Sequence, residues 1–141
     1  MMTPAGPSEA VLDRALREFL TARSRPSDLS LDDLAEWWER NVDVFCGCYQ
    51  FGWDEYVNDC AIRRLLDELL LHPVLRQAPR MPDIRARVLN SDARLARAFI
   101  AGVEIGDHRD PWWRRGMLAH AGQEYARDAL QLFDVRVDPC G

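Results

Sequence analysis

The residues best suited to acid and base chemistry gather in one short stretch of the chain. It holds three carboxylates and three aromatic side chains: Asp54, Glu55, Asp59, Tyr49, Trp53 and Tyr56. Such carboxylates could act as acid and base if burial separated their pKa values. Acids near a helix N-terminus also oppose the positive end of the helix dipole. We therefore favour capping over catalysis, with contact to a partner as a further role.

A metal site is the second chemistry that the spacing permits. His120 and Glu124 are four residues apart and Asp128 follows four later, so on one helix they would project from the same side. Glu104 and His108 repeat the spacing. It is not the Glu-x-x-His pattern of di-iron proteins, so we expect hydrogen-bonded or solvated histidines and no metal or cofactor.

The four cysteines lack the paired spacing of structural zinc sites, because Cys46-Gly-Cys48 is followed only by single residues. Cys60 is predicted to be a buried apolar residue. Cys46 and Cys48 are either packed thiols or a reducible pair, and Cys140 is expected to be exposed on a loose tail.

Arginine supplies the only pattern that could serve nucleic acid. The run comprises Arg76, Arg80, Arg85, Arg87, Arg94 and Arg97. A chain with a net charge of -5 and no Lys is a poor general binder of DNA, so this function is disfavoured. No phosphate loop or nucleophile elbow occurs.

The acidic and aromatic stretch must be positioned by the segment that contains it. From Trp53 to His72 the sequence has neither Gly nor Pro, and its apolar residues cover much more than a ~100° stripe. We expect one continuous helix ended by Pro73 and surrounded by others. The predicted fold is an all-α, single-domain bundle of five or six helices around this buried central helix, at about 54–72.

The other predicted helices follow from caps and helical periodicity. They cover residues 9–23, about 30–45, 83–90, 91–105 and 110–133. Ser30 with Asp33 resembles a capping box. The expected organisation is a disordered lead-in at 1–8, a helical domain at 9–134 and an extended tail at 135–141.

Composition agrees with a single domain, since 141 residues with 48% apolar content can form a real core. No apolar run reaches the ~18 residues of a membrane span, and residues 1–8 lack the features of a signal peptide. We therefore expect a cytoplasmic protein. All 18 basic residues are Arg, which is typical of GC-rich coding and suggests bacterial origin.

Charge is unevenly distributed, with -7 in residues 1–60 and +4 in residues 61–100. Either the acidic part forms an interaction face or the two parts neutralise one another within the fold. On the second helix, Trp38 has apolar neighbours four residues away on both sides. Trp37 has Asp33 and Asn41 there, so Trp37 is predicted to be partly exposed.

The leading hypothesis is a protein-binding inhibitor or neutraliser, of the immunity-protein, antitoxin or phage-encoded inhibitor type. Its partner would be another protein with a basic surface, attracted by acids and anchored by aromatic residues. The predicted contact residues are Asp32, Asp33, Glu36, Trp37, Glu39, Tyr49, Trp53 and Glu55. The alternatives are a small helical enzyme or metal protein that uses carboxylates and His, and an Arg-mediated regulator associated with nucleic acid.

Overall fold

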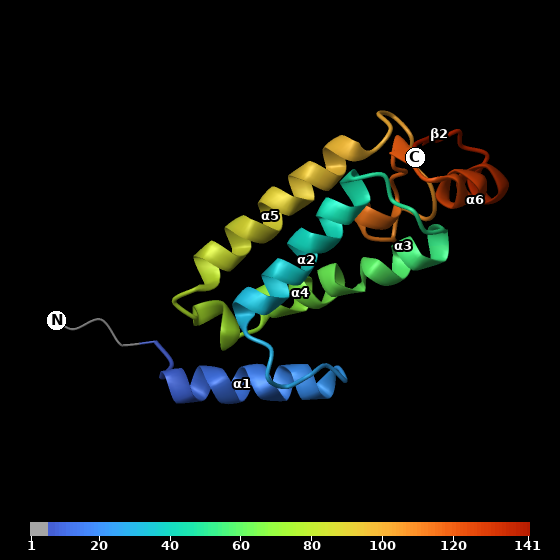
Figure 1. The fold of residues 1–141 in the computed structure, drawn as a ribbon. Coiled ribbons are helices and arrows are strands. Elements are labelled where there is room, and N and C mark those ends of the chain that lie inside the picture. The colour runs from blue at the N-terminus through green and yellow to red at the C-terminus, as the bar shows by residue number, and fades with distance from the viewer. Residues whose placement is uncertain (1–5) are drawn as a thin grey trace.

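The computed structural model describes residues 6–141, of which 61% are helical. The α-helices are α1 (Glu9–Ala22), α2 (Leu31–Cys46), α3 (Trp53–Asp59), α4 (Ala61–Leu71), α5 (Met81–Ala98) and α6 (Gln123–Phe133). Two 3-10 turns, η1 (Leu75–Gln77) and η2 (Trp112–Arg114), and two short strands, β1 (His120–Ala121) and β2 (Asp138–Pro139), complete the fold (Figure 1). The prediction of an all-α bundle is confirmed.

The centre of the bundle is the pair α2 and α5, not the helix that the sequence favours. These two helices run side by side, and ion pairs from Asp32 to Arg80 and from Asp43 to Arg94 show that they are parallel (Figure 1). Helix α4 packs on them with Leu66 and Leu69 fully buried. Its outer face is solvated, and Leu71 is 75% exposed. The prediction of a surrounded central helix is therefore wrong.

The expected continuous helix is also broken in two at Cys60. In an unbroken helix the Asp59 carbonyl would accept from the Arg63 N–H. Here the side chain of Asn41 donates to that carbonyl at 2.7 Å, and the Arg63 N–H turns to the Cys60 carbonyl at 3.0 Å. A side chain that takes a carbonyl from the helical ladder is a known cause of a kink. The bend is therefore imposed by α2.

Two further boundaries differ from the prediction. The segments expected as separate helices at 83–90 and 91–105 form the single helix α5, because Ser91 and Asp92 are buried inside it and do not cap a new start. The last helix begins at Gln123, not at residue 110.

Residues 99–122 are mostly irregular because the two ends of this segment fold back and pair with each other. Phe99 forms an antiparallel bridge with Leu118, and the Ile100 N–H donates to the Met117 carbonyl at 2.8 Å. Gly116 is required there, since a Cβ would lie 2.2 Å from the Phe99 ring. These long-range contacts override the helical periodicity.

Within the described residues 6–141, the segments near both ends of the chain contact the rest of the fold. Ser8 caps α1 by accepting from the Val11 N–H, and residues 1–5 of the expected lead-in lie outside the described part. At the other end β2 pairs in parallel with β1, and Val137 is buried. The expected loose tail is thus packed.

Candidate interaction surface

The predicted acidic face of α2 is largely occupied by α5. Arg80, at the N-cap of α5, is followed at intervals of seven residues by Arg87 and Arg94, so all three face the same side of this helix. Arg87 binds Glu39 at 2.5 Å and Asp32 at 2.9 Å, and Arg80 also binds Asp32. The hydrogen bond from Arg80 lowers the pKa of the Asp32 carboxyl below its ordinary value. Two predicted contact residues, Asp32 and Glu39, therefore have partners inside the chain.

Outside these contacts with α5, part of α2 still faces solvent. Trp38 is fully buried, where its indole N–H donates to Asp92, while Trp37 is half-buried as the sequence predicts. The Arg25 guanidinium lies 5.3 Å from the Trp37 ring centroid. Glu36 is exposed and pairs with Arg40 at 2.8 Å.

Asp33 is exposed, but it has a structural role. Its carboxylate accepts from the Ser30 N–H at 2.9 Å, and its own N–H donates to the Ser30 hydroxyl at 3.0 Å. This reciprocal capping box is confirmed. Charge reversal at Asp33 would therefore cost about 1 kcal/mol of folding stability, so it is not a clean probe of binding.

The connection from α2 to α3 buries one predicted contact residue and exposes its neighbours. Tyr49 is fully buried, and its hydroxyl donates to Asp59 at 2.7 Å. Burial first, and then this contact, raise the Tyr49 pKa well above its ordinary value. A partner cannot reach this ring, so its assignment as a contact residue is wrong. Phe51, absent from the predicted set, is 52% exposed.

Trp53 is half-buried and belongs to an aromatic cluster. Its ring stacks on Tyr56, with centroids 5.1 Å apart, and meets the edge of Phe133 at 5.0 Å. The Trp53 N–H donates to the Asp128 carboxylate at 2.8 Å, so α6 caps α3. Gly52 permits this approach, because a Cβ there would lie 2.5 Å from the same carboxylate.

Asp54 and Glu55 occupy the first turn of α3 and are exposed. Neither forms an ion pair within residues 6–141, in contrast to Asp32 and Glu39 on α2. Asp54 and Glu55 also oppose the positive end of the α3 dipole. We call exposed Phe51, Asp54 and Glu55 together with half-buried Trp53 the α3 surface. Phe51 and Tyr49 are both aromatic residues of the same connection and differ in burial. No local pattern in the sequence predicts which of the two is exposed.

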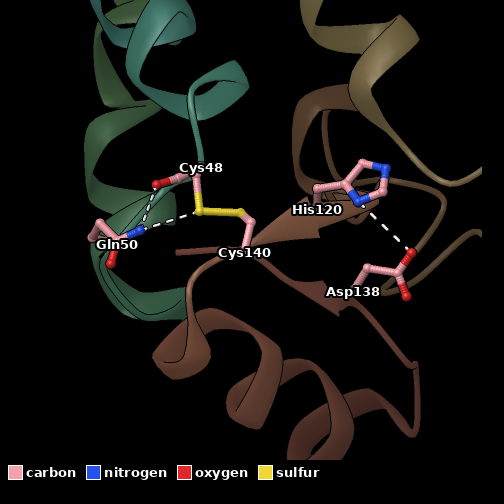
Figure 2. Close-up of a disulfide and its surroundings, with 5 residues drawn as sticks. All are labelled: Cys48, Gln50, His120, Asp138 and Cys140. Carbon is pink, nitrogen blue, oxygen red and sulfur yellow. Dashed lines mark hydrogen bonds and ion pairs between the residues drawn. A yellow bond between two sulfur atoms is a disulfide. The ribbon is translucent and has the colours of Figure 1, made fainter.

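The cysteines pair differently from either expectation. Cys48 is joined to Cys140, which fastens the tail to the connection between α2 and α3 (Figure 2). Cys46 is a free, exposed thiol. Cys60 is buried as predicted, and burial raises its pKa to about 12. The predicted alternative of a bond between Cys46 and Cys48 is therefore wrong, and so is the prediction that Cys140 is a free thiol.

The histidine and carboxylates suggested for a metal do not converge. His120 lies in β1, with its Nδ1 3.7 Å from Asp138 (Figure 2), whereas Glu124 and Asp128 lie on α6. Asp128 is engaged by the Trp53 backbone. Within residues 6–141 no three His, Cys, Asp or Glu side chains are grouped as a metal ion requires. The premise that these residues share one helix is wrong.

The chain matches no protein-family model, and no curated protein or solved structure resembles it significantly. No helix within residues 6–141 combines the length and apolar character needed to cross a membrane.

Proposed function

We propose that this protein acts by binding another protein, as an inhibitor or neutraliser of the immunity-protein, antitoxin or phage-encoded inhibitor type. The contact is made by the α3 surface. One observation carries this proposal: Phe51 is 52% exposed and is followed closely in the chain by Asp54 and Glu55, two exposed carboxylates with no ion-pair partner within residues 6–141. Exposed aromatic side chains are frequent anchors of interfaces.

The partner that suits this surface is basic. Two free carboxylates attract Lys or Arg on the approaching protein and raise the rate of association at low salt. Asp32 and Glu39 attract a basic partner much less strongly, because Arg80 and Arg87 already neutralise their charges.

The α3 surface is also well fixed for binding. Asp128 caps α3, and Trp53 is clamped between Tyr56 and Phe133. A rigid surface loses little conformational entropy on association, so more of the contact energy appears as affinity. The outward face of α2, with Glu36 and Trp37, extends the proposed contact as a secondary region.

The test is affinity capture from the native cell, followed by a titration of the captured protein against purified variants. Phe51→Ala and Glu55→Arg should each weaken binding about tenfold or more, equal to about 1.4 kcal/mol. Leu132→Ala is the matched control, since Leu132 is 59% exposed on α6 outside this surface. Full affinity in both α3 variants would disprove the proposal.

We further propose that the protein is bacterial and cytoplasmic, and its disulfide makes this location testable. Thiols there are kept reduced, whereas the Cys48–Cys140 bridge is typical of an oxidising compartment. Alkylation of thiols in freshly lysed native cells distinguishes these locations. Cytoplasmic protein should be labelled at Cys48 and Cys140, and protection of both would place the chain in an oxidising compartment.

A further inference from the structure

Helix α1 packs unevenly along its length. At its C-terminal end Phe19 and Leu20 are buried, with 3% and 0% exposure, whereas Leu12 and Leu16 towards the N-terminal end are only half-buried. The Phe19 ring meets the edge of His72, and Arg23 pairs with Glu68 at 2.5 Å. The helix is therefore deeply buried at its C-terminal end and only partly covered at its N-terminal end, where Leu12 and Leu16 pack against the edge of the core.

The space under the N-terminal end is a groove of about 650 Å³. It lies between α1, the connection to α2 and the segment from Leu75 to Arg80. Its floor is apolar and includes Leu12, Leu16, Leu29, Leu31, Leu75 and Ala78. The volume lies within the range of ~300–1000 Å³ that small-ligand pockets occupy, so it suits a few side chains.

The rim of this groove is acidic. Glu9 and Asp13, four residues apart on α1, stand at one edge, and Asp28 stands at the other. None of these three carboxylates forms an ion pair within residues 6–141. Arg17 is the one basic rim residue besides Arg80, which is bound to Asp32. The rim therefore has an unneutralised negative charge above an apolar floor.

We infer that this groove binds a short amphipathic segment of a partner protein, with apolar side chains facing inward and Lys or Arg at its edges. Charge complementarity selects this occupant, because an acidic segment would bring carboxylates against Glu9, Asp13 and Asp28. The inference goes beyond the function proposed above, since α1 and α3 lie at different ends of the molecule (Figure 1).

The probes are three fluorescent peptides of about twelve residues. The first is a helix former with Leu on one face and Arg on the other, the second replaces each Arg by Glu, and the third shuffles the first so that Leu is spread around the helix. The full chain should bind the first peptide, measured by anisotropy. It should bind the other two about tenfold more weakly or less.

Two charge reversals on α1 locate the site. Asp13→Arg should weaken binding of the first peptide by about fivefold or more at low salt. Glu18→Arg makes the same change in net charge at an exposed position outside the groove and should alter binding less than about twofold.

Four results would overturn the inference: no binding of the first peptide at about 1 mM, equal binding of the shuffled or acidic peptide, an equal loss in both α1 variants, or loss of binding in Phe51→Ala. The last result would move the peptide to the α3 surface and leave the function proposed there intact. Conversely, peptide binding that persists in Phe51→Ala supports the groove, whatever the capture experiment shows.

Discussion

Asn41 on α2 donates a 2.7 Å hydrogen bond from its side chain to the backbone carbonyl of Asp59, where the chain bends between α3 and α4. At its other end α3 is capped by Asp128 of α6. The α3 segment is therefore held by a side chain at each end, Asn41 of α2 at one and Asp128 of α6 at the other.

Replacing Asn41 by Ala should destabilise the protein by about 1 kcal/mol, because a hydrogen bond to a partly buried carbonyl is lost. Hydrogen exchange should show a changed rate at the Arg63 amide, since the Asp59 carbonyl becomes free to accept from it. Asn58→Ala, an exposed change on α3, is the control and should leave both readouts nearly unaltered. Equal effects of the two substitutions would contradict this role for Asn41.

Asp92→Ala should be among the most damaging single substitutions. Arg63, 5% exposed, donates two hydrogen bonds of 2.8 Å to Asp92, and the Trp38 indole donates a third at 3.0 Å. Loss of one partner from a buried ion pair typically costs about 3–5 kcal/mol. Urea unfolding measures this loss.

The matched test removes both charges. In Arg63→Met combined with Asp92→Leu, no uncompensated charge stays buried, so the loss should be clearly smaller than the sum of the two single losses. Additive losses would show that the two residues act independently.

The ion pair between Asp32 and Arg80 should appear in the acid stability of the protein. Because the folded-state pKa of Asp32 lies below its ordinary value of 3.8, the stability that it contributes is fully present above 3.8. It is lost as the pH falls through the folded-state pKa. The stability difference between wild type and Asp32→Asn, measured by urea midpoints, should therefore shrink below pH 3.8. A difference independent of pH would contradict the assignment.

Reduction of the Cys48–Cys140 bridge should lower the free energy of unfolding by about 2–4 kcal/mol, because the bridge closes a long loop in the unfolded chain. The two cysteines are 92 residues apart in sequence. Cys140→Ser should match the reduced wild type. Cys46→Ser should unfold like the oxidised protein, since Cys46 is a free, exposed thiol. Identical urea midpoints with and without reductant would show that the bridge does not stabilise the fold.

Short-range patterns in the sequence predict those structural features that depend on residues within about one helical turn. Ser8 and Ser30 cap α1 and α2 as expected, since a cap depends on residues within one turn. The contrast between Trp37 and Trp38 also follows from their neighbours four residues away.

Tertiary contacts determine helix breaks and extended segments that no local sequence pattern predicts. Periodicity continues through Cys60, but Asn41, eighteen residues before Asp59, binds the Asp59 carbonyl and interrupts the helix there. Phe99 and Leu118 pair as extended chain where the sequence favours helix.

The acidic part of the chain shows the same limit. Seven-residue spacing on each helix is visible in the sequence, but only the parallel packing of α2 and α5 places Arg87 against Glu39. That pairing neutralises much of the predicted face on α2 and leaves the free carboxylates on α3 and α1. Local sequence thus determined the caps of α1 and α2 and the helical character of the chain. Long-range packing determined where several helices begin or break and which of their charges remain available to a partner, because net charge at a surface depends on neighbours that only the fold supplies.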